Sequence, residues 1–198
     1  MLDAETALLR LKQGNKEFRS GETPIEVDEE RRLKLVEQQQ PFAIILGCSD
    51  SRVPVELIFA QGLGELFVIR VAGNVATPTQ IGSIEFAARN FGSKLVVVLG
   101  HSSCGAIKAT IRELENPGQD LTPNLQVIVD SIKPGISSCI TAEDPLETKI
   151  EKAVRANVQS TIKRITNESE ILQQKVAKEG LKIVGAEYSL ESGIVNFF

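Results

Sequence analysis

The 198-residue sequence has no tryptophan, one tyrosine, one methionine, one histidine and three cysteines. No apolar run in it approaches the ~20 residues that a membrane-spanning helix needs, so we expect no membrane partner. Three cysteines cannot all pair with one another, and charged residues occupy the first segment, where a secretory signal would be apolar. Both features predict a cytoplasmic location, where thiols stay reduced. The single histidine, His101, confines any histidine chemistry to one position.

An excess of positive charge is also missing, since 22 basic residues face 26 acidic ones and the net charge is −4. Nucleic acids and anionic membranes bind basic surfaces, so we expect no nucleic-acid partner either. Hydrophobic residues make up 42% of the chain, which is typical of a folded protein and not of a disordered one. A chain of this length fits one domain, so residues 1–198 are predicted to form a single domain.

Short apolar runs alternate with helical patterns along the chain. Continuous apolar runs predict strands buried on both faces over residues 42–46, 66–69 and 95–100, and a closing pair of strands over 182–188 and 194–198. Apolar residues at helical spacing predict helices over residues 4–18 (interrupted at Gly14), 28–39, 81–91, 106–114, 124–132, 146–165 and 168–178. Buried strands that alternate with helices indicate an α/β fold with a central parallel sheet flanked by helices.

Two short motifs carry side chains that bind metals, and each directly follows a predicted buried strand. Cys48 begins the first motif, CSDSR, and the second motif, HSSC, contains His101 and Cys104. In a parallel α/β sheet, both motifs would lie at the carboxyl ends of strands, where such folds place their sites. Thiolates and imidazole are ligands that zinc prefers, whereas magnesium and calcium prefer oxygen. These three residues are therefore candidate zinc ligands.

Other interpretations of the same residues stay open at this point. A cysteine after a strand often fills the core, a histidine is often structural, and Cys48 or Cys104 could be a nucleophile that His101 activates. Asp50 and Arg52 favour a reactive metal site, because an aspartate held ionised by a guanidinium can accept a proton from metal-bound water. Asp50 could instead occupy the fourth position on the metal, or the pair could simply fix the loop.

The motifs C-x-D-x-R and H-x-x-C, in this order and each after a strand, resemble those of the β-class carbonic anhydrases. The resemblance extends to residues 7–21, 64–74, 82–87 and 186–193. It is weakest between Asn116 and Lys178, where only helical character is evident. The resemblance implies a central parallel sheet of about four strands with an added C-terminal strand. It also implies a homodimer or homotetramer in which the N-terminal helices of about residues 1–40 pack on a partner subunit.

The resemblance further implies an activity, the reversible hydration of carbon dioxide to bicarbonate and a proton by attack of zinc-bound hydroxide. Carbon dioxide or bicarbonate would be the small-molecule substrate. One zinc ion per chain would be bound by Cys48, His101 and Cys104, which match the family's ligands. Asp50 and Arg52 match the family's catalytic pair.

The resemblance also assigns positions around the metal site. Gln39 and Phe67 fall where the family places side chains that line the substrate pocket. Some members bind bicarbonate at a second, inhibitory site built from a tryptophan, an arginine and a tyrosine. Arg70 and Tyr188 match two of these positions, but Ile45 stands where the tryptophan would be, so we expect no such site.

Three rival functions remain for these residues. A hydrolase of carbonyl sulfide or carbon disulfide would use the same zinc site. A non-catalytic zinc-binding assembly protein would not need Asp50 and Arg52. A cysteine-nucleophile enzyme would contain no zinc. If His101 is a ligand, the chain has no imidazole left to carry the proton away, so we expect buffer to take it. Cys139 matches no motif and is predicted to be a free thiol.

Overall fold

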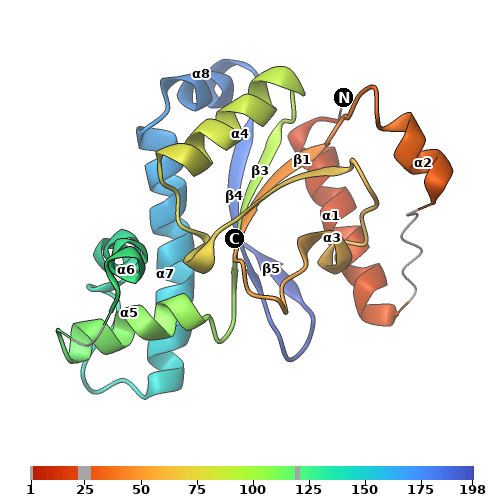
Figure 1. Ribbon diagram of the computed structural model, residues 1–198. Helices are drawn as coiled ribbons and strands as arrows, with labels where there is room; N and C mark the ends of the chain where they lie inside the picture. The colour runs from red at the N-terminus through yellow and green to blue at the C-terminus, as the bar shows by residue number, and fades with distance from the viewer. Residues whose placement is uncertain (1, 22–27, 119–120) are drawn as a thin grey trace.

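The computed structural model describes residues 2–21, 28–118 and 121–198 (Figure 1). These residues form an α/β fold in which helices cover both faces of a five-stranded sheet. Within the described ranges, no helix has both the length and the apolar composition to span a bilayer. The fold class that the sequence predicted is confirmed.

The sheet has the strand order β2-β1-β3-β4-β5. The strands β1 (Ala43–Gly47), β2 (Leu66–Arg70), β3 (Leu95–His101) and β4 (Lys182–Tyr188) are parallel, and β5 (Val195–Phe197) is antiparallel to β4. This arrangement confirms the predicted four parallel strands with an added C-terminal strand. The strands β1, β2 and β3 all end on the side where the 3-10 helix η1 (Ala72–Asn74) and α5 (Gly105–Glu115) lie (Figure 1).

Alternate side chains of the central strands enter two separate cores. Ile45 and Val97 point into the core covered by α1 (Ala4–Ser20) and α3 (Val55–Ile58). Ile44 and Val96 point into the core covered by α4 (Pro78–Asn90), α7 (Leu146–Asn167) and α8 (Glu170–Lys178). Every residue of β1 and β3 is therefore buried, which explains the unbroken apolar runs in the sequence.

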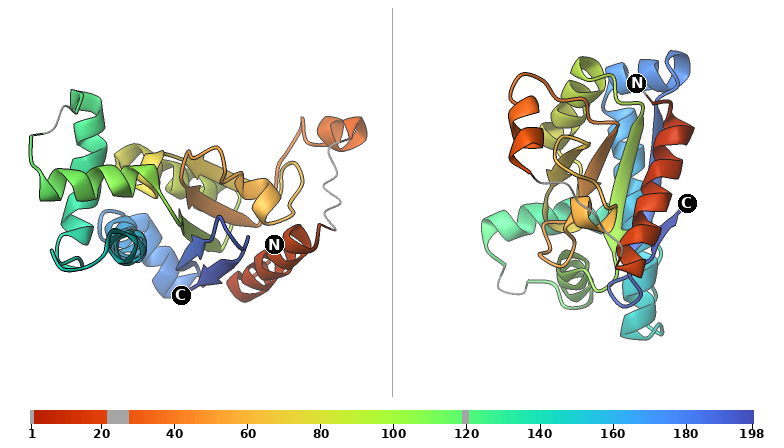
Figure 2. Two further views of the ribbon diagram at one scale, coloured as in Figure 1. Left: turned by 90° about the horizontal axis from the view of Figure 1, so that it is seen from below. Right: turned by 90° about the vertical axis from the view of Figure 1, so that its right-hand side faces the viewer.

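A third core lies beyond the strand ends, between α5, α6 (Pro123–Ile136) and α7. Cys48 and Cys104 belong to this core, together with isoleucines from the three helices. The helix α6 and the short helix α2 (Glu29–Lys34) project at opposite ends of the molecule (Figure 2). The metal-binding motifs therefore lie where the sheet meets a helical layer.

The helix α1 has clear signals at both ends. It begins after Asp3, whose Oδ1 accepts a hydrogen bond from the Thr6 N–H at 2.8 Å, and it ends at Gly21, which has a left-handed φ of 74°. Gly14 does not interrupt the helix, so that prediction is wrong. A Cβ at Gly14 would lie 1.8 Å from the carbonyl oxygen of Phe59. Glycine at this position lets α1 lie directly against the chain that follows α3.

Two further predictions need correction. The helix predicted over residues 28–39 covers only Glu29–Lys34, because its apolar residues find no core: Leu33 is 59% exposed and Val36 is 75% exposed. The strand β2 is only half-buried, although its sequence predicted burial on both faces, because it is the edge strand of the sheet. The short elements α3 and η1 were not predicted, since a single turn has too few residues to show a period.

The helix α6 continues past its predicted end at residue 132, through Pro134 and Gly135. A Cβ on Gly135 would lie 2.6 Å from the Cβ of Ser160, so glycine allows α6 to pack closely on α7. This packing outweighs the helical hydrogen bond that the proline cannot make.

Candidate metal centre

Three metal-binding side chains meet where β1 and β3 end. Cys48 directly follows β1, His101 is the last residue of β3, and Cys104 directly precedes α5. Their ligand atoms, two Sγ atoms and a ring nitrogen, all lie within 4.8 Å of one another, and all three residues are buried. The structure thus brings together the three residues that the sequence indicated as candidate ligands.

The orientation of His101 leaves one ring nitrogen available. Nδ1 lies 2.9 Å from the carbonyl oxygen of Ser102, and this oxygen can only accept a hydrogen bond, so Nδ1 carries the proton. Nε2 therefore keeps its lone pair, and this buried atom has no hydrogen-bond partner in the described part of the chain. A buried polar atom without a partner is unfavourable in a folded protein. A metal ion on Nε2 would satisfy it, and the bond at Nδ1 is the usual way to orient such a ligand.

The turn between His101 and Cys104 is fixed by the chain that follows β4. The N–H of Ser102 donates to the carbonyl oxygen of Tyr188 at 2.9 Å, and the Oγ of Ser102 accepts from the N–H of Leu190 at 2.9 Å. Ser103 has a φ of 58°, in the left-handed region, so the chain turns sharply between the two candidate ligands.

The two buried thiols are neighbours, with their Sγ atoms within 4.8 Å of each other. The neighbouring Cys104 thiol, then the His101 side chain, and then the backbone N–H groups of Asp50 and Gly73 lower the pKa of Cys48 to about 4. The hydrogen bond to the Cys48 thiolate, and then burial, raise the pKa of Cys104 well above its ordinary value. The pair thus holds one negative charge readily, and a cation that replaces the remaining proton would stabilise the second thiolate.

Asp50 and Arg52 form a bidentate ion pair beside the thiols. Arg52 Nε donates to Asp50 Oδ1 at 2.9 Å, Arg52 Nη2 donates to Asp50 Oδ2 at 2.7 Å, and the Arg52 N–H also donates to Oδ1 at 3.0 Å. These hydrogen bonds hold the pKa of Asp50 well below its usual range, so the carboxylate is ionised at neutral pH. Oδ2 lies 3.9 Å from Nε2 of His101. The pair therefore lies at the cluster, as the sequence suggested.

Arg70, the last residue of β2, holds the loop that carries Cys48 and Asp50. Its Nε donates to the carbonyl oxygen of Cys48 at 2.9 Å, and its Nη2 donates to the carbonyl oxygen of Asp50 at 2.6 Å. Sequence reasoning missed this role. The only signal for it is the position of Arg70 at the carboxyl end of a strand next to β1.

The three residues that correspond to the family's inhibitory bicarbonate site have different surroundings in this structure. Ile45 is fully buried in the middle of β1, and Tyr188 is buried in β4 opposite His101. Arg70 bonds to the loop after β1. The expected lack of an inhibitory site stays a prediction.

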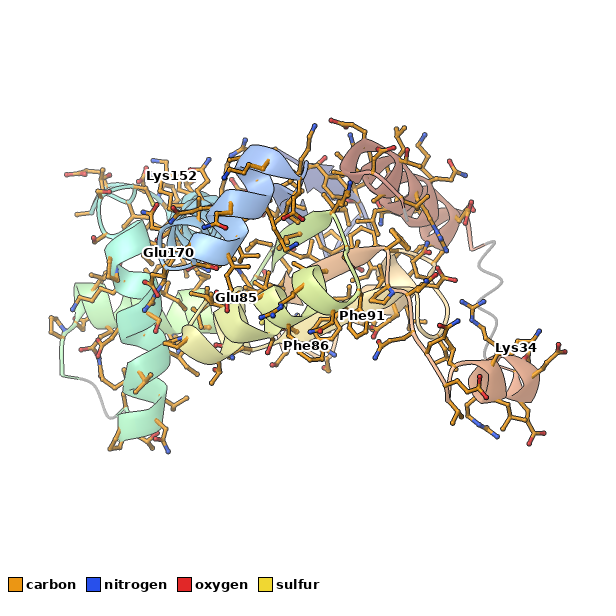
Figure 3. The ribbon with its side chains drawn as sticks, turned by 90° about the horizontal axis from the view of Figure 1, so that it is seen from above. Lys34, Glu85, Phe86, Phe91, Lys152 and Glu170 are labelled. Atoms are coloured by element: carbon orange, nitrogen blue, oxygen red, sulfur yellow. The ribbon has the colours of Figure 1, made fainter. Side chains whose placement is uncertain are left out.

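Gln39 and Phe67 do not join the cluster within one chain. Gln39 is exposed in the segment before β1, whereas Cys48 follows the other end of that strand. The Phe67 ring lies 6.2 Å from the Phe86 ring and 5.9 Å from the Phe91 ring, centroid to centroid. Figure 3 shows Phe86 and Phe91 close together at the end of α4. The pocket-lining role of Gln39 and Phe67 stays a prediction.

Cys139 lies outside the cluster, as the sequence indicated. It is partly buried after α6, and its Sγ donates to the carbonyl oxygen of Ile136 at 3.1 Å. Burial raises the pKa of this thiol, and no other metal-binding side chain of the described residues forms a cluster with it.

The donor set determines which metal fits the cluster. Two sulfur atoms and one imidazole nitrogen suit zinc, whereas magnesium and calcium require oxygen ligands. Three protein ligands leave one tetrahedral position for water or substrate, as in catalytic zinc sites. The residues present therefore fit a catalytic metal ion with an ionised carboxylate beside it.

Comparisons with known proteins agree with this chemistry. A family model described as carbonic anhydrase matches residues 43–195. A carbonic anhydrase of Mycolicibacterium smegmatis is 36% identical over 187 residues, which cover 93% of this chain and 88% of that protein. Carbonic anhydrase 2 of Mycobacterium tuberculosis is 35% identical over 184 residues, which cover 92% of this chain and 87% of that protein.

Solved structures have the same fold. The β-carbonic anhydrase CafA of Aspergillus fumigatus matches with a TM-score of 0.77 at 23% identity, over 98% of this chain and 89% of that one. The β-carbonic anhydrase CcaA matches with a TM-score of 0.75 at 26% identity, over 98% and 88% of the two chains. A β-carbonic anhydrase of Sordaria macrospora, described as tetrameric, matches with a TM-score of 0.73 at 24% identity, over 98% and 97%.

Proposed function

The chain belongs to the β class of the carbonic anhydrase family, and we propose from this membership that it hydrates carbon dioxide reversibly to bicarbonate and a proton. The observation that carries the proposal is the buried cluster of Cys48, His101 and Cys104, with Nε2 of the histidine lacking a hydrogen-bond partner in the described residues. We propose that these residues hold one zinc ion per chain. When bound by three protein ligands, zinc supplies a water molecule whose pKa is lowered toward about 7.

We propose that Asp50 accepts a hydrogen bond from the reacting water and so orients it. The Arg52 guanidinium supports this role in two ways. It keeps the Asp50 carboxylate ionised at neutral pH, and it fixes the direction of both carboxylate oxygens. Arg70 keeps the loop of Cys48 and Asp50 in place through their carbonyl oxygens. For Asp50 to move onto the metal, its bonds to Arg52 would have to break.

The product proton has no imidazole to accept it within the chain. His101 is the only histidine, and its Nδ1 proton is bonded to the carbonyl oxygen of Ser102. We therefore propose that external buffer takes the proton, by way of water. A hydration rate that does not change with buffer concentration would contradict this part of the proposal.

We also propose that the enzyme is a homodimer or homotetramer in the cytoplasm. Within one chain, Gln39 and Phe67 lie away from the cluster, so they can line a substrate pocket only if a second copy brings them to it. The tetrameric Sordaria macrospora relative supports an oligomer of this fold. Sedimentation of the purified protein tests the oligomeric state.

The test of the function is stopped-flow hydration of carbon dioxide by zinc-loaded protein, with metal analysis of the same sample. Asp50→Asn removes the charge of the proposed orienting group, and we expect it to lower kcat about 100-fold or more. Asp144→Asn is the matched control, because Asp144 also pairs with a cation, Lys152, but lies in the turn before α7. The control should keep the wild-type rate.

Each rival function has its own outcome in this test. Hydrolysis of carbon disulfide without hydration of carbon dioxide would identify the sulfur-substrate hydrolase. Zinc without either activity would identify a non-catalytic zinc-binding protein. Less than about one zinc per chain in protein purified without chelator would favour a cysteine nucleophile, for which the lowered pKa of Cys48 would be the activating feature.

A further inference from the structure

Cys48 accepts a hydrogen bond from the backbone outside its own loop. The N–H of Gly73, in η1, lies 3.4 Å from Cys48 Sγ, and both groups are buried. Hydrogen bonds to a metal-bound thiolate withdraw charge from the sulfur, and such surrounding partners tune the metal and its affinity. The position of the Gly73 peptide therefore affects the candidate ligand directly.

Gly73 is held in a conformation that glycine adopts without strain. Its φ is 72°, in the left-handed region, and a Cβ would lie 2.7 Å from Ile132 Cδ1 and 3.1 Å from Ala106 Cβ. The chain at Gly73 thus packs tightly against α5 and α6, with no room for a side chain. The peptide that joins Gly73 to Asn74 is bonded on one side, since the Asn74 N–H donates to the carbonyl oxygen of Val71 at 3.0 Å.

Asn157 bonds the other side of this peptide from a distant part of the chain. Its Nδ2 donates to the carbonyl oxygen of Gly73 at 2.8 Å. Asn157 lies in α7 and is 2% exposed, so water does not compete for this bond. One glycine therefore bonds at its N–H to Cys48 and at its carbonyl oxygen to Asn157.

We propose that Asn157 is a positioning residue of the metal centre, acting through Gly73 on the Cys48 thiolate. The inference rests on the proposed metal site but not on which substrate it uses. Without the amide of Asn157, the Gly73 carbonyl oxygen is buried and unpaired, and η1 must shift to reach another donor. That shift lengthens the N–H···S bond, so the Cys48 side chain is held less firmly in position for the metal, and more charge stays on its sulfur.

The first variant to test is Asn157→Leu, which keeps the number and branching of the side-chain heavy atoms and removes the donor. Its matched control is Ile165→Val, two turns further along α7, at a fully buried position whose core contains residues of α4 and α8. A second variant, Asn157→Ala, also removes the donor. Alanine has a high helix propensity, so this variant can be tested if the leucine variant does not fold. All are made in the full chain, and circular dichroism confirms that each is folded.

The first readout is zinc affinity, measured by competition with a chromophoric chelator. We expect both Asn157 variants to bind zinc about 10- to 100-fold more weakly than wild type, the usual range for such partners. The Ile165→Val control should stay within about 2-fold of wild type, because it touches no outer partner of the site. The second readout is the thiolate-to-metal charge-transfer band of the cobalt(II)-substituted proteins. A thiolate that loses a hydrogen bond donates charge more easily, so this band should move to longer wavelength in the Asn157 variants only.

Wild-type zinc affinity and an unshifted cobalt band in a folded Asn157 variant would overturn the inference. Equal weakening in the Ile165→Val control would also overturn it, because the effect would then come from helix stability. Neither result bears on the proposed function, which fails only if the zinc-loaded wild-type protein does not hydrate carbon dioxide.

Discussion

Replacing Gly100 with alanine should disturb the metal centre through α7. Gly100 precedes His101 in β3, and a Cβ there would lie 2.8 Å from Val158 Cγ2 and 3.1 Å from Val154 Cγ1. Both valines belong to α7, which rests directly on the strand at this point. A methyl group in this contact has to displace the helix, or else the strand that carries the histidine.

The size of the effect follows from this contact. Overpacking of a tight core costs ~1–3 kcal/mol, so we expect Gly100→Ala to lower the free energy of unfolding by about 2 kcal/mol. Val158→Ala removes two buried methyl groups and leaves a cavity, which should also cost about 2 kcal/mol. In the double variant, the alanine methyl takes part of the space that Val158 leaves. The double variant should therefore lose at least ~1 kcal/mol less than the sum of the two single losses.

Urea unfolding of the chelator-treated proteins measures these free energies, at one protein concentration because subunit association adds to apparent stability. Hydration by the zinc-loaded proteins is compared in parallel. We expect Gly100→Ala to slow hydration and the double variant to recover part of the rate. Losses that add to within about 0.5 kcal/mol would refute the claim that the two side chains compete for one space.

Four further outcomes are expected. Arg70→Gln should weaken zinc retention about 10-fold in chelator competition, because the loop of Cys48 and Asp50 loses two hydrogen bonds. Arg89, exposed on α4, is the control position, and an equal loss in Arg89→Gln would contradict the role of Arg70 in holding the loop. Zinc retention should fall as pH decreases, because protons compete for Cys104, whose pKa is raised; release that is independent of pH would contradict it. The ion pair with Arg52 lowers the pKa of Asp50 in the folded protein. It therefore stabilises the fold above the unfolded-state pKa of about 4, and this stabilisation is lost as pH falls through the folded-state pKa. The free energy of unfolding, measured in acid, should depend less on pH in Asp50→Asn than in wild type. Cys139→Ser should leave zinc content and hydration unchanged, and a loss of zinc in that variant would place Cys139 at the site.

The cluster of candidate ligands was predictable because its signals are local in the sequence. Each motif directly follows a buried strand, and the carboxyl ends of parallel strands that lie side by side meet at one edge. β1 and β3 are hydrogen-bonded neighbours, so Cys48 and His101 meet as a direct result of the strand order. The ion pair of Asp50 and Arg52 was predictable for the same reason, since the two residues share one tight turn.

The supporting contacts were not predictable, because they join segments that are far apart in the sequence. Nothing in the sequence around Asn157 indicates that its amide reaches the carbonyl oxygen of Gly73. Likewise, the sequence indicates that Gly14 interrupts the helix, because it does not show that the carbonyl oxygen of Phe59 packs against this position. Helix propensity describes the isolated chain, and here tertiary packing overrides it.

The strand order also has a consequence for synthesis. β3 lies between β1 and β4 in the sheet, but β4 is the last of the four parallel strands in the sequence. Both candidate ligand cysteines are therefore made before Tyr188 and Leu190, whose backbone groups bond to Ser102 in the turn after His101. During that interval the thiols are open to oxidants and to whichever metal arrives first. The turn between the two candidate ligands is therefore completed only after Leu190, 88 residues beyond Ser102, has been made.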